Sequence, residues 1–259
     1  MKVFKIFALC FAVLATGLVG VAAEESEGLF SSPEDKKQFA HEVSSLIERA
    51  WKKWQDAVRV NDVYVDGSRG VLSAGDLKGP VLTASNIMKG FDREGRSQEY
   101  IGCVRAVAVA VENGMRLWQR GYTHNNIPFP RGASCTITLP PCNNVPVTVA
   151  SGRSSGDGAM KQKALYNYML YRSPGQEKDV LTVFHGCAKA ISGCLSAWKK
   201  SCSITGILAS GGIAPQPAPM GPGPGLVRGA KGKDGKLTGA YFDGDLMYRE
   251  MMKYFRTGA

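Results

Sequence analysis

The sequence predicts an α+β fold, mainly helical, built from three related helix-turn-strand units with a β-hairpin insertion and a Pro/Gly-rich C-terminal arm. Three segments align without a gap, and each is a long amphipathic helix with a Trp near its end, a small polar turn and an extended stretch. Strand-like alternation near 135–150 surrounds a central Pro-Pro and predicts the hairpin. Residues 211–235 are rich in Pro and Gly, which predicts an irregular or polyproline-like arm rather than a core element. The aligned segments are 39–65, 103–129 and 183–209.

The alignment is anchored on Trp54, Trp118 and Trp198 and places apolar positions of the three helices in register. Related units can cover one another's apolar faces, which would explain a core. We therefore expect the three Trp side chains to be buried, with each indole N–H bonded in the following turn. A sugar-stacking platform is the alternative. The aligned apolar sets are Val43, Val107 and Cys187; Leu46, Ala110 and Ala190; and Ile47, Val111 and Ile191.

The elements follow in order along the chain. Ser32 is a suitable N-cap with Pro in the first turn, so the first helix is expected to run to about Val58. Glycines then interrupt short apolar runs over 62–75, which indicates strands and turns. The second long helix, 96–122, is apolar nearly all round at its centre and is expected to be the most buried. The remaining helices are expected at 83–91, 159–171, 176–203 and 245–255.

The first 23 residues have the features of a signal peptide. Lys2 and Lys5 precede an apolar run, and Val21-Ala22-Ala23 supplies a small-residue cleavage site. The domain division is then a signal peptide at 1–23, a helical repeat-containing domain at 24–210, an arm at 211–235 and a C-terminal docking helix within 236–259. We expect a periplasmic or extracellular protein with no stable membrane span in the mature chain.

The chain is basic, with a formal net charge of +10 that falls to about +8 once Lys2 and Lys5 are removed. Such a charge suits anionic polymers, although a solvated basic surface is the ordinary explanation. Basic residues are scattered along the chain and are concentrated only near the end of the arm. The candidate anion-binding residues are Arg228, Lys231, Lys233 and Lys236.

Six cysteines remain after removal of the signal peptide, and an even number in an oxidising compartment predicts disulfides. Cys135 and Cys142 flank a short loop that a bridge would close. Cys187, Cys194 and Cys202 follow one helix at spacings of seven and eight, too far apart to bond one another. We therefore expect Cys103 to bond one of these three.

One catalytic pattern is present. Gly152-Arg153-Ser154-Ser155-Gly156 matches G-x-S-x-G between a strand-like and a helical segment, with Asp179 and His185 following in triad order. A serine hydrolase using Ser154 is therefore one hypothesis. The absence of alternating strands and helices argues against it, as does the placement of Asp179 and His185 six residues apart on one helix. A helix-capping Gly/Ser loop is the simpler interpretation.

No metal or cofactor motif occurs in the sequence, and we expect neither. We favour an exported, non-catalytic structural or interaction protein that associates with itself or with another envelope or extracellular protein. The alternatives are a binding module for anionic glycan or nucleic acid, and the secreted serine hydrolase.

Overall fold

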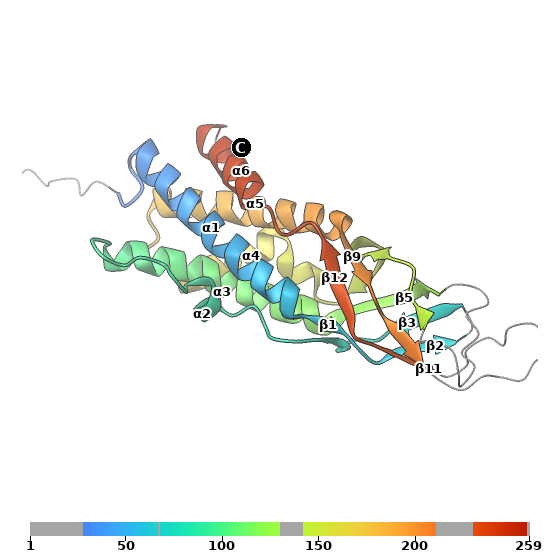
Figure 1. Cartoon of the computed structure of the whole chain (residues 1–259). Coiled ribbons are helices and arrows are strands. Elements are labelled where there is room, and N and C mark those ends of the chain that lie inside the picture. Colours follow the sequence, from blue (N-terminus) through green and yellow to red (C-terminus); the bar gives the residue numbers. More distant parts are fainter. Residues whose placement is uncertain (1–27, 67, 130–141, 211–229, 258–259) are drawn as a thin grey trace, which may run out of the picture.

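The computed structural model describes residues 28–66, 68–129, 142–210 and 230–257. The predicted signal peptide lies outside these residues. The fold is mixed α+β, as predicted: helices occupy one end of an elongated molecule and two antiparallel sheets occupy the other (Figure 1).

Three long helices form the body: α1 (Pro33–Ala57), α3 (Gln98–Gly121) and α5 (Lys178–Ser201). Ser32 begins α1 with a capping box, in which its hydroxyl accepts from the N–H of Asp35 and the Asp35 carboxylate accepts from the N–H of Ser32. Each helix ends three residues after its Trp, and the capping residue that follows is extended. The chain then enters β1 (Arg59–Val60), β5 (Tyr122–Pro128) or β9 (Cys202–Thr205).

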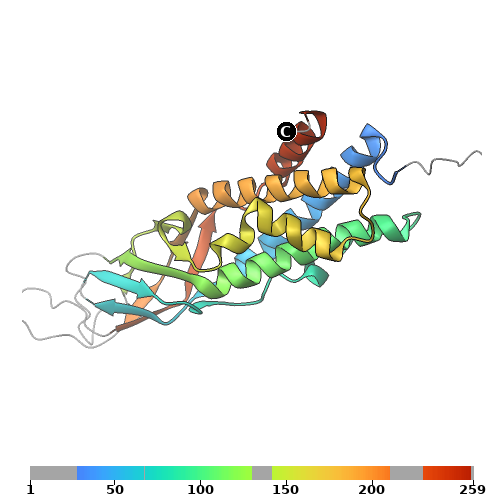
Figure 2. The same ribbon diagram turned by 180° about the vertical axis from the view of Figure 1, so that it is seen from behind.

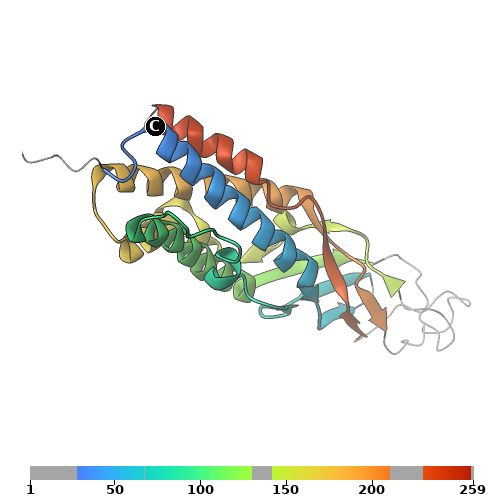
Figure 3. The ribbon, with the colours of Figure 1, turned by 60° about the vertical axis from the view of Figure 1, so that its left-hand side comes forward.

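Three shorter helices complete the helical layer. α2 (Ala84–Ile87) packs on α1 and α3, and α4 (Gln162–Arg172) lies between α3 and α5 (Figure 2). α6 (Gly244–Thr257) lies along α1 and α5 (Figure 3), burying Met247 and Met251. The C-terminal helix therefore covers the body of its own chain. Two 3₁₀ turns, η1 (Val149–Ser151) and η2 (Asp157–Met160), precede α4.

The strands form two antiparallel sheets. The five-stranded sheet has the order β4-β1-β12-β9-β7 and adds β4 (Leu77–Lys78), β12 (Gly235–Gly239) and β7 (Val147–Thr148). The seven-stranded sheet has the order β6-β10-β11-β2-β3-β5-β8. Its other strands are β6 (Cys142–Asn143), β10 (Leu208–Ser210), β11 (Ala230–Lys233), β2 (Val63–Asp66), β3 (Arg69–Leu72) and β8 (Arg153–Ser154).

Three stretches of chain pass from one sheet to the other through a residue with positive φ. These residues are Asp62 (56°), Gly206 (69°) and Asp234 (63°). The Asn61 side chain accepts from the N–H of Asp234 at 2.9 Å, which joins two of the bends. Asn144 holds the third, because its amide donates to the carbonyl of Ile204 and its oxygen accepts from the N–H of Ile207. Asp and Asn tolerate or stabilise such bends through local hydrogen bonds.

The described part of the predicted arm is strand rather than irregular chain. Residues 230–233 form β11 inside the seven-stranded sheet, and Gly235 begins β12. A Cβ at Gly232 or Gly235 would lie 2.5 Å from the side chain of Ile207, so the glycines allow two strands to pass over a buried Ile. The rest of the arm, 211–229, lies outside the described residues.

The predicted hairpin near 135–150 is described only in part. Val147 and Thr148 pair with Ile204 and Ser203 of β9, and β6 pairs with β10. The expected first arm of the hairpin, 136–139, lies outside the described residues.

One described helix, α5, is long and apolar enough to cross a membrane by length and composition. In its most apolar window, 56% is buried inside the protein, against α4 and α6 among others. Such burial is typical of a core helix.

Candidate functional site

The tryptophans that end the three long helices form one buried cluster. Their ring centroids are 6.4 Å apart for Trp54 and Trp118, 5.9 Å for Trp54 and Trp198, and 5.7 Å for Trp118 and Trp198. Each side chain is at most 3% exposed. Edge-to-face and tilted aromatic contacts of this kind stabilise a core. The cluster is core packing, because the three indoles face one another inside the protein instead of forming an exposed row for a sugar.

The indole N–H groups of this cluster are satisfied between helices. Trp54 Nε1 donates to Gln119 Oε1 at 3.0 Å, and Trp198 Nε1 donates to Gln55 Oε1 at 2.8 Å. Each acceptor is the residue directly after another Trp of the cluster. The expected partner in the following turn is therefore wrong for these two residues, because the neighbouring helix supplies a buried Gln instead.

Trp118 is satisfied by a carboxylate. The residue after Trp198 is Lys199, which has no acceptor, and Asp157 lies between the two groups. Asp157 Oδ1 accepts from Trp118 Nε1 at 3.1 Å and from Lys199 Nζ at 2.6 Å. Burial by itself raises the pKa of Asp157, but the hydrogen bonds from Lys199, Ser154 N–H and Trp118 outweigh it and hold that pKa below its ordinary value.

Ser154, the candidate nucleophile, is a buried structural residue. Its hydroxyl donates to the carbonyl of Trp118 at 2.7 Å and accepts from the N–H of Gly156 at 3.0 Å. The loop fits closely against α3, because a Cβ at Gly156 would lie 2.3 Å from the carbonyl oxygen of Leu117. These contacts anchor the Gly/Ser loop to the end of α3.

The other two candidate triad residues lie in different surroundings. Asp179 accepts from the N–H of Phe30 at 2.6 Å and from its neighbour Val180. The His185 ring stacks on Tyr254, with centroids 5.2 Å apart, and contacts Tyr166 edge-on. In the described part of the chain, no hydrogen bond joins Ser154, Asp179 and His185 to one another.

The structure does bring one Ser–His pair together, which sequence reasoning missed. His124 Nε2 lies 2.9 Å from Ser151 Oγ, and His124 Nδ1 accepts from the N–H of Asn126. Because Nδ1 is an acceptor, the proton is on Nε2, which donates to Ser151. Ser151 in turn donates to the carbonyl of Thr148 at 2.6 Å. A general base would need a free lone pair on Nε2, so this tautomer holds the loop and does not activate Ser151.

The expected bridge from Cys103 to Cys187, Cys194 or Cys202 is wrong. All four are buried free thiols. The thiol of Cys187 donates to Met251 Sδ on α6 at 3.4 Å. Burial raises the pKa of Cys103, Cys194 and Cys202 to about 12 and raises that of Cys187 further. The side chains of the other expected pair, Cys135 and Cys142, lie outside the described residues.

The candidate anion-binding residues lie on exposed strand positions. Lys231 and Lys233 alternate with buried Ala230 and Gly232 along β11, and Lys236 is exposed on β12. Arg228 lies outside the described residues. Lys231 pairs in register with Tyr64, and Tyr64 pairs with Val71, so the three residues form one row across β11, β2 and β3. Within the described ranges, no three His, Cys, Asp or Glu side chains gather as metal ligands would.

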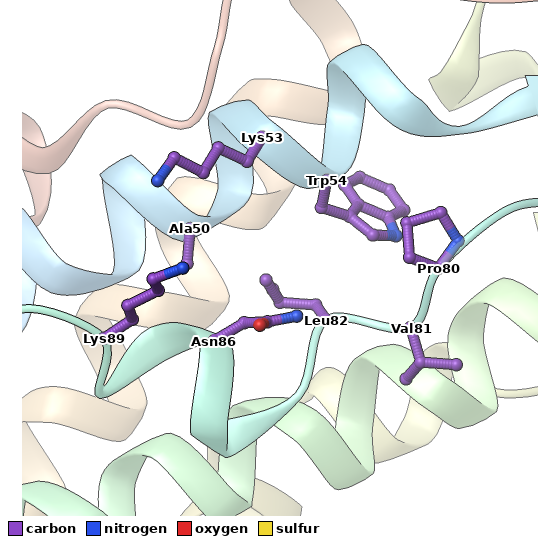
Figure 4. Close-up of a pocket in the computed structure, with 8 residues that line it drawn as sticks. All are labelled: Ala50, Lys53, Trp54, Pro80, Val81, Leu82, Asn86 and Lys89. Carbon is purple, nitrogen blue, oxygen red and sulfur yellow. The ribbon is translucent and has the colours of Figure 1, made fainter.

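A small pocket opens between α1 and the chain that follows β4. Its volume is about 150 Å³. Figure 4 shows Trp54 and Pro80 at one end and the side chains of Lys53 and Lys89 at the other. Sequence patterns gave no signal for this pocket, because Lys53 and Lys89 are two of many exposed lysines. The lining residues are Ala50, Lys53, Trp54, Pro80, Val81, Leu82, Asn86 and Lys89.

Comparison with known proteins gives no assignment: no family model, no curated protein and no solved structure matches this chain.

Proposed function

We propose that this chain is an exported, non-catalytic structural protein that associates with copies of itself through the outer face of its seven-stranded sheet. The observation that carries the proposal is the row Val71–Tyr64–Lys231. Tyr64 is 54% exposed and Val71 is 36% exposed, and the two are directly paired across β2 and β3. Adjacent exposed apolar side chains on a sheet favour a protein contact, with Tyr as a preferred interface residue.

The hydrogen bonds and ring contacts of the candidate catalytic residues support a non-catalytic role. Ser154 and Ser151 donate to backbone carbonyls, and His124 is fixed in the tautomer that cannot accept from Ser151. His185 lies between Tyr166 and Tyr254. Each group that the hydrolase hypothesis would use serves the fold instead.

We also propose that α1–β1, α3–β5 and α5–β9 are three related helix-turn-strand units. Helix ends and burial support it, since each helix ends three residues after its Trp and the residue nine positions after that Trp is fully buried in all three (Val63, Ile127 and Ile207). The indole hydrogen bonds also connect the units in a cycle. Trp54 of the first unit donates to the second unit, Trp118 of the second donates to Asp157, which also binds Lys199 of the third, and Trp198 of the third donates to the first. Lys199 breaks the Gln pattern in the third unit, and Asp157 compensates.

The repeat proposal has a direct test. Asp157→Ala should lower the free energy of unfolding by about 1–3 kcal/mol, because it leaves the buried Trp118 N–H without an acceptor. Adding Lys199→Gln should recover part of that loss, since a Gln here would stand where Gln119 and Gln55 stand in the other units. Urea unfolding of the single and double variants measures both. A double variant no more stable than Asp157→Ala would contradict equivalence of the three positions.

Self-association is tested by sedimentation of the chain lacking residues 1–23. The wild-type protein should form a concentration-dependent oligomer, and Tyr64→Glu should shift it to the monomer. Tyr171→Glu is the matched control, because Tyr171 is 82% exposed on α4, outside both sheets, and the change should leave the size unaltered. The opposite outcome is a wild-type protein that stays monomeric and binds a polyanion. If Lys231→Glu/Lys233→Glu then abolishes polyanion binding, the anionic-polymer alternative replaces self-association.

A further inference from the structure

We propose that the pocket beside Trp54 binds a small amphiphilic carboxylate, in which an apolar group about the size of a benzene ring lies next to the negative charge. This site is separate from the sheet face and does not depend on the proposed self-association. The argument rests on the size of the cavity, the character of its two ends and the charges that surround it.

The floor and one end of the pocket are apolar. Ala50, Trp54 and Leu82 are at most 5% exposed, and Pro80 and Val81 form the wall opposite α1. The Trp54 N–H is already bonded to Gln119, so this end offers the ligand carbon surface rather than a donor. A cavity of about 150 Å³ in apolar surroundings is large enough for a benzene ring.

The other end carries unpaired positive charge. Lys53 on α1 and Lys89 after α2 extend from opposite walls (Figure 4). Within the described part of the chain, no hydrogen bond or ion pair joins either ammonium to a carboxylate. Arg49 lies one turn before Lys53, and its guanidinium approaches Gly90, next to Lys89. Two lysines therefore line this end with Arg49 near Lys89, and a bound anion would relieve the mutual repulsion of the cations.

The combination selects the ligand class. A purely apolar molecule would leave the cations unpaired, and a simple inorganic anion would leave the apolar floor exposed to water. A carboxylate attached through a short link to a ring satisfies both ends at once. Asn86 at the rim provides an amide that can donate a further hydrogen bond to the carboxylate.

The test uses 3-phenylpropionate as the probe and the indole N–H signal of Trp54 in a ¹H–¹⁵N spectrum, assigned with Trp54→Phe, as the reporter. In a titration to about 10 mM, a range that detects a millimolar Kd, we expect a saturable shift of that signal. Propionate lacks the ring and 3-phenylpropylamine carries the opposite charge, so each should bind at least fivefold more weakly. No saturable shift, or equal binding of the amine, overturns the proposal.

Variants locate the binding on this pocket. Lys53→Ala/Lys89→Ala should weaken binding of 3-phenylpropionate at least tenfold. Lys52→Ala is the matched control, since the Lys52 ammonium lies over the ring of Tyr241 instead, and it should change binding less than twofold. Ala50→Leu adds carbon to the cavity itself and should abolish the shift. Two outcomes would place the probe elsewhere and overturn the proposal. One is binding that is retained in Ala50→Leu, and the other is binding that Lys52→Ala weakens as much as Lys53→Ala/Lys89→Ala does.

Discussion

The indole N–H of Trp198 donates to the side-chain oxygen of Gln55, 143 residues earlier in the chain, at 2.8 Å. Both side chains are buried, at 2% and 1% exposed. A buried Gln is costly without partners, and this one also donates its amide to the carbonyl of Ala240. The bond therefore joins the ends of α1 and α5 and the segment that leads into α6.

Gln55→Met should lower the free energy of unfolding by about 1–3 kcal/mol, because the Trp198 N–H would stay buried without an acceptor. Urea unfolding followed by Trp fluorescence measures the change. Gln98→Met replaces an exposed Gln in the first turn of α3 and should shift stability by less than about 0.5 kcal/mol. An equal loss of unfolding free energy in the two variants would show that the hydrogen bond between Gln55 and Trp198 does not stabilise the fold.

His124 should make stability depend on pH. Burial lowers its pKa from the ordinary value of 6.5, so the unfolded chain binds a proton more readily than the folded one. The stabilising effect of the neutral ring is complete above pH 6.5 and is lost as the pH falls from 6.5 towards the folded pKa. Protonation would also remove the bond from Asn126 N–H to Nδ1.

The measurement is the difference in unfolding free energy between pH 7.5 and pH 5.5. It should be smaller in His124→Asn than in the wild type, because the substitution removes the group whose pKa is lowered by burial. A wild-type difference that persists in full in His124→Asn would assign the pH dependence to another group.

The features that follow from local chemistry could be predicted from the sequence. The capping box at Ser32, the helix that follows it and the burial of the Trp cluster need only neighbouring residues and helical periodicity. The prediction of an irregular arm is wrong for its last residues, 230–235, because Gly232 and Gly235 allow the two strands there to pass closely over Ile207. That requirement exists only once three distant segments meet.

The polar contacts could not be predicted, for the same reason. Nothing local to Gln55 or Asp157 indicates an indole from another helix as partner. His124 and Ser151 are 27 residues apart, and no motif links them. The pocket at Lys53 and Lys89 likewise forms only where α1 and the chain after β4 come together.

The four described cysteines should be free in the purified protein. Alkylation of unfolded, non-reduced protein, followed by peptide mapping, should label Cys103, Cys187, Cys194 and Cys202. In the folded protein at pH 8 the same thiols should react slowly, because they are buried and their raised pKa values leave little thiolate. Recovery of a disulfide-linked peptide containing Cys103 would contradict the free-thiol assignment.

The C-terminal helix should stabilise its own chain without controlling the size of an assembly. α6 inserts Met251 against Cys187 of α5, and a Cβ at Gly186 would lie 2.6 Å from the ring of Phe255, so the two helices are in close contact. Met251→Ala should therefore lower the free energy of unfolding by about 2–5 kcal/mol, because Met251 is fully buried. Met252→Ala should lower it by less, because Met252 is only partly buried. Thermal unfolding gives the stability order, and sedimentation of both variants should give the wild-type size. A smaller particle for Met251→Ala at a temperature where it remains folded would mean that α6 also contacts a neighbouring copy.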